Sequence, residues 1–141
     1  MILSESDRTR VKQMLGAMVS PVRLVFFTQS LSCDTCLPAR QILDELVGQT
    51  DKLSIDERNF ILDKDAAAGF GIDRVPAIAV MAGERDTGIR FLGVPAGYEF
   101  SALIDALVAA STGQSGLSAT SRAKLREIPS PVRIQVFVTP T

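Results

Sequence analysis

The stretch VRLVFFTQSLSCDTCLPARQILDELV, residues 22–47, decides the fold. Residues 22–28 are almost all apolar and rich in β-branched and aromatic side chains, which predicts a strand buried on both faces. Residues 36–47 place apolar side chains at the three- and four-residue spacing of an amphipathic helix, and Gly48 ends it. A buried strand that leads directly into a helix is typical of an α/β protein.

The elements on either side continue this alternation. Residues 4–18 predict an additional helix before the first strand, because their apolar side chains again recur at helical spacing. After residue 47 the expected order is strand 53–59, helix 63–70, strands 77–81 and 89–92, and helix 101–110. We therefore expect an α/β fold with a central mixed sheet flanked by helices on both faces.

Composition excludes several classes of function. The 141 residues are 46% hydrophobic and 22% charged, which suits a packed domain and argues against disorder. A net charge of −1 gives no electrostatic basis for binding nucleic acid or a membrane surface. The chain has no His, so it cannot supply a Ser-His or Cys-His catalytic pair or a Cys/His zinc site. With two Cys it cannot build a four-thiolate metal site alone, and we expect no bound metal.

The sequence carries no sign of a leader or a membrane span. Residues 1–10 include charged side chains from position 5 onward and lack the apolar run of a signal peptide. The longest apolar stretches are far too short to cross a bilayer. We therefore expect a cytoplasmic protein, where paired cysteines are more often catalytic or metal-binding than structural.

The two cysteines lie in Cys33-Asp34-Thr35-Cys36, between the buried strand and the helix. The N–H groups and macrodipole of a helix N-terminus stabilise a thiolate, so we expect the pKa of Cys33 to lie below its ordinary value. The carboxylate of Asp34 opposes that shift. Cys33 would attack a substrate disulfide, and Cys36, one turn further inward, would resolve the mixed disulfide. Two alternatives remain: half of a metal site shared between chains, and an inert pair of thiols.

A second motif, Val75-Pro76, precedes the apolar strand 77–81. An X-Pro bond has a small trans preference, so a cis bond is accessible at a tight turn. The alternative is an ordinary trans proline at the start of a strand, where the missing N–H is tolerated.

A repeat links the two ends of the sequence. Residues 20–24, SPVRL, resemble residues 130–134, SPVRI, at a shift of 110, and Leu15 then matches Leu125. A tandem duplication predicts a unit over 1–111, a linker over 112–117 and the start of a second unit over 118–141, whose first Cys would fall at 143. A chance pattern is the alternative. We expect the apolar strand 131–138 to fold back onto the first unit or to form a homodimer, because its edge is otherwise unpaired.

Together, the strand, the CDTC motif, the helix and Val75-Pro76 resemble the thioredoxin/glutaredoxin superfamily over residues 22–110. The additional N-terminal helix and the repeat resemble the glutaredoxin-like protein disulfide oxidoreductases, and also the N-terminal domain of the alkyl hydroperoxide reductase flavoprotein, both built from tandem thioredoxin folds. The resemblance implies a thioredoxin fold, a cis Pro76 that faces the CxxC, and a Val75 backbone that pairs with the substrate.

The same resemblance implies a protein disulfide oxidoreductase. Its partners would be protein disulfide or dithiol substrates and a thioredoxin-reductase-like flavoprotein donor, and it would use no cofactor besides the Cys33–Cys36 disulfide. The alternative function is a docking or relay unit of a two-unit redox protein with little activity of its own.

Two positions depart from the thioredoxin pattern. Phe27 stands where thioredoxins carry a buried acid, and Ser32 stands where they carry a Trp. Glu57, on strand 53–59, is a candidate substitute acid if its side chain faces inward. The alternative is a solvated carboxylate or an ion-pair partner of Arg58.

Overall fold

The structure is a computed structural model and describes residues 2–139. Its sheet has four strands in the order β2-β1-β3-β4. They are β1 (Val22–Thr28), β2 (Leu53–Asn59), β3 (Ala77–Ala82) and β4 (Arg85–Leu92). β1 pairs in parallel with β2 and antiparallel with β3, and β3 pairs antiparallel with β4. The predicted mixed sheet is confirmed, with β1 in its interior.

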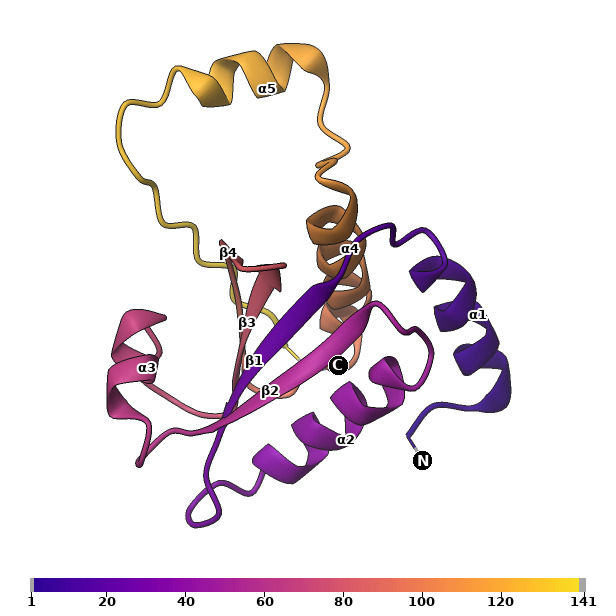
Figure 1. Ribbon diagram of the computed structural model, residues 1–141, viewed down its shortest axis with the longest axis vertical. Helices are drawn as coiled ribbons and strands as arrows, with labels where there is room; N and C mark the ends of the chain where they lie inside the picture. The colour runs from indigo at the N-terminus through magenta and orange to yellow at the C-terminus, as the bar shows by residue number, and fades with distance from the viewer. Residues whose placement is uncertain (1, 140–141) are drawn as a thin grey trace.

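Helices cover both faces of this sheet (Figure 1). On one side lie α1 (Glu5–Leu15), α2 (Cys36–Val47) and α4 (Tyr98–Thr112), and on the other lies α3 (Lys64–Gly69). Leu24 and Phe26 of β1 belong to the core beneath α1, α2 and α4, whereas Val25 and Phe27 belong to a smaller core beneath α3. Because successive strand residues point to opposite faces, β1 is buried on both sides, as its composition predicted.

The first helix is shorter than predicted. The Ser4 side chain caps it by accepting a hydrogen bond from the Asp7 N–H at 3.1 Å. It ends at Leu15 rather than at residue 18, and Gly16 is its C-cap. Met18 still joins the core, although it lies beyond the helix. The link between α1 and β1 is fixed by Ser111 of α4, whose Oγ accepts the N–H groups of Val19 and Ser20 at 2.9 Å each.

β4 begins four residues earlier than predicted, at Arg85. Its register with β3 shifts between Ala79 and Met81. Gly88, at a φ of 80°, and Thr87, whose hydroxyl donates to the Val80 carbonyl at 2.6 Å, lie at this irregularity. A β-bulge accommodates a glycine such as Gly88, which a regular strand disfavours. The alternation of apolar and polar residues is interrupted there, and the first half of β4 was therefore not predicted.

The helix α5 (Ala119–Arg126) stands apart from this core, and the segment that follows it runs back toward the sheet (Figure 1). α5 is capped by Ser118 and buries none of its side chains. No strand is formed over residues 131–139, so the predicted strand 131–138 is wrong for this single chain, and the homodimer expected through it stays a prediction. The apolar side chains of this segment are all at least half exposed, because within the described residues no neighbouring strand or helix covers them. No helix in residues 2–139 is long and apolar enough to cross a membrane.

Candidate functional site

The two cysteines form a disulfide where β1 leads into α2. Cys33 and Cys36 are bonded, and their Cα atoms lie 5.4 Å apart. Cys36 is the first residue of α2 and is only 4% exposed, whereas Cys33 is half-buried in the preceding turn. Asp34 and Thr35 are both exposed. The predicted difference in accessibility between the two sulfurs is therefore confirmed, and Cys33 is the one that a partner can approach.

The first turn of α2 offers fewer free N–H groups than its sequence position suggested. The Cys36 N–H donates to the Cys33 carbonyl at 3.3 Å, and the Ala39 N–H donates to the Thr35 carbonyl at 3.1 Å. Pro38 has no N–H at all. The Leu37 N–H is thus the donor of this turn that lacks a hydrogen bond among the described residues, and it is the one available to a Cys33 thiolate.

Val75-Pro76 lies at the same end of the sheet as the disulfide. The bond between the two residues is cis. Ala77, which follows, pairs with Phe27 near the carboxyl end of β1, and the loop to Cys33 starts from that end. The Pro76 carbonyl accepts the Gly93 N–H at 2.8 Å. In residues 2–139 the N–H and the carbonyl of Val75 have no hydrogen-bond partner, so both can pair with an incoming strand.

The charged groups beside this proline are paired with each other. Arg74 Nε donates to Asp73 Oδ1 at 2.8 Å. This hydrogen bond lowers the pKa of Asp73 and raises the pKa of Arg74. At the start of α4, burial raises the pKa of Glu99, a shift that its sequence position did not signal.

Phe27 and Glu57 lie on opposite faces of the sheet. Phe27 is fully buried and packs edge-on against Phe70, with ring centroids 5.9 Å apart, so no acid occupies the thioredoxin position. Glu57 is exposed and forms an ion pair with Arg40 of α2. The suggested pairing with Arg58 is wrong, because Arg58 faces the other side of the sheet and binds a different carboxylate. A proton-transfer role for Glu57 stays a prediction, and its exposed ion pair does not favour one.

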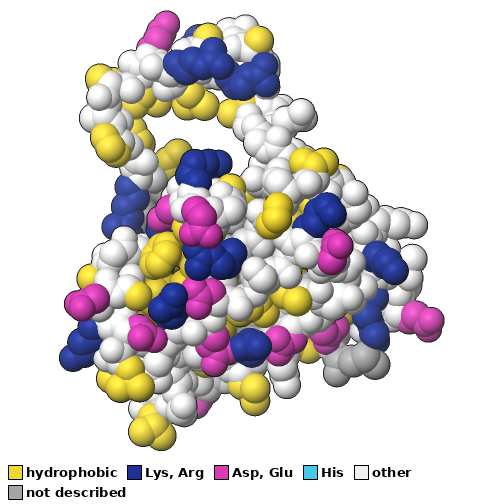
Figure 2. All heavy atoms as spheres, in the orientation of Figure 1, with side chains coloured by type: hydrophobic (Ala, Val, Ile, Leu, Met, Phe, Trp, Pro, Cys, Tyr) yellow, Lys and Arg dark blue, Asp and Glu magenta, His cyan; other side chains and the backbone are white. Residues whose placement is uncertain are grey.

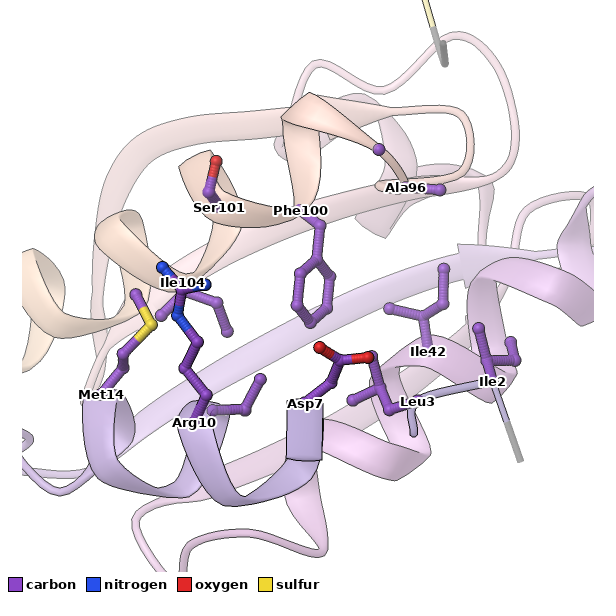
Figure 3. A pocket seen from close by; sticks show the side chains of 12 residues that line it. Ile2, Leu3, Asp7, Arg10, Met14, Ile42, Ala96, Phe100, Ser101 and Ile104 are labelled. Atoms are coloured by element: carbon purple, nitrogen blue, oxygen red, sulfur yellow. The ribbon is translucent and has the colours of Figure 1, made fainter. Parts of the chain in front are cut away.

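A groove lies away from the disulfide, between α1 and the first turns of α4 (Figure 3). Its volume is about 370 Å³, and most of its lining is apolar. The ring of Phe100 points toward the carboxylate of Asp7, which accepts a hydrogen bond from the Ser4 hydroxyl at 2.6 Å. Neither cysteine and neither residue of the cis bond lines this groove, so it is not where the sulfur chemistry occurs.

Comparison with known sequences adds two relatives, although no family model matches the chain. A "Probable Thioredoxin" of Methanothermobacter marburgensis is 31% identical over 86 residues, which make up 60% of this chain and 94% of that protein. An "NADH dehydrogenase" of Bacillus subtilis is 30% identical over 78 residues, 55% of this chain but only 13% of that protein. The chain therefore matches nearly all of the first relative and a small part of the second.

Solved structures show the same fold. A protein disulfide oxidoreductase from Aeropyrum pernix superimposes with a TM-score of 0.79 and 27% identity, over 91% of this chain and 56% of that chain. An alkylhydroperoxide reductase, AhpF, from Enterococcus faecalis gives a TM-score of 0.83 and 22% identity, over 92% of this chain and 62% of that chain. The chain thus spans little more than half the length of these structures. Its fold, its CxxC disulfide and its match to nearly the whole of one thioredoxin relative show that the chain belongs to the thioredoxin family.

Proposed function

We propose that this chain is a thiol–disulfide oxidoreductase that reduces, oxidises or exchanges protein disulfides. The observation that carries the proposal is the disulfide between a half-buried Cys33 and an almost fully buried Cys36, at the sheet end that also holds the cis Val75-Pro76 bond. The match to a disulfide oxidoreductase at 27% identity supports the same chemistry.

In the reducing direction the Cys33 thiolate attacks one sulfur of the substrate disulfide. A mixed disulfide forms, and the other substrate sulfur leaves as a thiolate that takes a proton from water. The Cys36 thiol then loses its proton to solvent and attacks the Cys33 sulfur. The second substrate thiol is released, and the Cys33–Cys36 disulfide remains. Two electrons have passed from the dithiol to the substrate, and oxidation of a substrate dithiol follows the same steps in reverse.

The free backbone of Val75 gives the substrate its orientation. An extended substrate segment pairs with this N–H and carbonyl as an added strand, which brings its disulfide to the exposed side of Cys33. The dithiol itself is the redox group, so the reaction needs no further cofactor. A thioredoxin-reductase-like flavoprotein is the proposed donor of electrons, and a reversible dithiol suits a reducing compartment such as the cytoplasm.

The test is reduction of insulin disulfides with dithiothreitol as the electron source. We expect Cys33→Ser to remove the activity and Cys36→Ser to accumulate a mixed disulfide with the substrate. Thr35→Ser, which changes an exposed neighbour and keeps both sulfurs, is the matched control and should retain the activity. Full activity in Cys33→Ser would refute the assignment of the nucleophile.

A second function, a docking or relay unit within a two-unit redox protein, is favoured by the C-terminal part of the chain. We infer that residues 1–111 form one thioredoxin-like unit, that 112–117 link it onward, and that 118–141 begin a second unit. The exposed α5 and the uncovered apolar segment that follows it support this division, as do structural neighbours of which the matched part covers only 56% and 62%. A relay unit would exchange disulfides with a second redox protein while reducing insulin poorly, so measuring both rates separates the two functions.

A further inference from the structure

The loop of residues 29–32 joins β1 to Cys33 and lies on the surface. Figure 1 shows the loop extending below the sheet and α2, and Figure 2 shows this end of the molecule as a narrow tip. Ser30, Leu31 and Ser32 are all exposed, so packing against other elements does not fix their backbone. The conformation of the loop therefore depends on its own hydrogen bonds.

One residue of this loop has a backbone conformation that residues with a side chain disfavour. Ser32, directly before Cys33, has a φ of 57°, and every other residue with a positive φ in residues 2–139 is a glycine. The contact between Cβ and the backbone disfavours this left-handed region by about tenfold in population. Such a conformation persists only where the surrounding structure holds it.

The side chain of Gln29 holds Ser32 in this conformation. Its Nε2 donates to the carbonyl of Leu31 at 2.7 Å and to the carbonyl of Ser32 at 3.4 Å. These carbonyls belong to the two planar peptide groups on either side of Ser32, so orienting both groups fixes the φ and ψ of that residue. The second group also contains the N–H of Cys33. Gln29 therefore fixes the direction in which the backbone enters the cysteine.

The disulfide holds the same loop from its other end. In the disulfide form Cys33 is bonded to Cys36, the first residue of α2, while the loop starts directly from β1. Both ends of the loop are then anchored, and Ser32 cannot leave the left-handed region without moving one of them. Reduction breaks the bond at Cys33, and the hydrogen bonds of Gln29 then oppose the relaxation of Ser32.

We propose that Gln29 is a positioning residue that keeps Cys33 within reach of Cys36 in the dithiol form. The inference rests on the thiol–disulfide exchange proposed above and assigns one determinant of its redox equilibrium. With Gln29 in place the dithiol retains the backbone of the disulfide form, so the Cys36 sulfur can close the bond without first reordering the loop. Without Gln29, Ser32 relaxes in the dithiol form alone, which becomes more stable relative to the disulfide.

Equilibration with glutathione tests this inference, because the dithiol and one oxidised glutathione give the disulfide and two reduced glutathione molecules. We expect Gln29→Met, which removes the donor at similar side-chain length, to lower the equilibrium constant for disulfide formation about tenfold, a potential about 30 mV less negative. Gln41→Met, at an exposed glutamine of α2, is the matched control and should stay within twofold of wild type. In a Ser32→Gly background, Gln29→Met should change the constant less than about threefold, because glycine adopts a positive φ readily.

The outcomes separate the positioning role from the activity. A constant within twofold of wild type in Gln29→Met overturns the inference, as does an equally large change in the Ser32→Gly background. If Gln29→Met does not fold, the side-chain amide resonances of Gln29 in the 15N-labelled wild-type chain decide: equal shifts in both redox states support the role, and the shifts of a free amide after reduction overturn it. An altered constant in a chain that does not reduce insulin supports the role and refutes the proposed function, whereas insulin reduction with an unchanged constant does the reverse.

Discussion

Ser111 is the buried polar group on which the junction between α1 and β1 depends, and we predict that Ser111→Ala destabilises the whole domain. Its side-chain oxygen accepts the N–H groups of Val19 and Ser20 at 2.9 Å each and donates to the Ser20 carbonyl at 2.7 Å. Alanine removes the acceptor and leaves both N–H groups without a partner. An unsatisfied buried donor costs about 1–3 kcal/mol. Since both groups are partly buried, we expect a loss of about 2–3 kcal/mol in the free energy of unfolding.

Urea denaturation followed by far-UV circular dichroism measures this loss. With a slope of about 2 kcal/mol per molar urea, the midpoint should fall by about 1–1.5 M while the slope stays constant. Ser101→Ala is the matched control, because this serine of the same helix is exposed and donates only to the Tyr98 carbonyl, so we expect a change below about 0.5 kcal/mol. Equal midpoints for the two variants would refute the reasoning. Disulfide reduction should survive in Ser111→Ala, since Ser111 lies at the opposite end of the sheet from the disulfide.

Three further changes test other contacts. The pKa of Glu45 is lowered from its ordinary value of 4.5 because the backbone N–H groups of Ile2 and Leu3 donate to its carboxylate. The stabilisation that these hydrogen bonds give the folded N-terminal segment is therefore complete above pH 4.5 and is lost as the pH falls through the folded pKa. The protection of the Leu3 amide against hydrogen exchange, relative to the intrinsic rate at the same pH, should therefore fall in acid, and it should also be lower at neutral pH in Glu45→Gln. Arg90 donates to the Phe70 carbonyl at 3.0 Å, so Arg90→Gln should lower the free energy of unfolding by about 1–2 kcal/mol in urea. Glu57→Gln should leave the rate of insulin reduction and its pH profile within twofold of wild type, because Glu57 is exposed and ion-paired.

Each of these predictions has a control or an opposing result. Glu84→Gln is the control for Glu45→Gln, since the Glu84 carboxylate is almost fully exposed and contacts Arg23 instead of the N-terminal segment. Arg85→Gln, an exposed arginine at the β3–β4 turn, should leave stability unchanged and is the control for Arg90→Gln. An acid limb that disappears from the pH profile of Glu57→Gln would instead establish the carboxylate as the proton carrier.

Local sequence signals explain how much of the fold and the site could be predicted. β1 was predictable because a strand buried on both faces needs apolar residues throughout, and α2 because its apolar stripe repeats at helical spacing. The cis bond at Pro76 was expected from the family resemblance, and its place at the disulfide end of the sheet follows from the pairing of Ala77 with Phe27. The strand order was not predictable, because it depends on contacts between strands far apart in sequence.

The errors have equally specific causes. The alternation along β2 shows which residues share a face with Glu57, but it does not show which face of the strand lies beneath α2. The ion pair between Glu57 and Arg40 of α2 identifies that face in the structure. Pro38 reduces the free donors at the start of α2, an effect that helix propensity alone does not reveal. The apolar alternation of residues 131–138 is a genuine strand signal, but a strand forms only where another strand supplies hydrogen bonds.

The short separation of the two cysteines has a consequence for how the domain responds to reduction. The disulfide closes a loop between positions only three apart, and a cross-link over so few residues removes little entropy from the unfolded chain. The chain-entropy relation gives about 2 kcal/mol for such a loop, less than the about 5–15 kcal/mol by which native domains are stable. We therefore expect the domain to stay folded in both redox states, so that the proposed exchange can open and close the bond without unfolding the sheet and helices that position it.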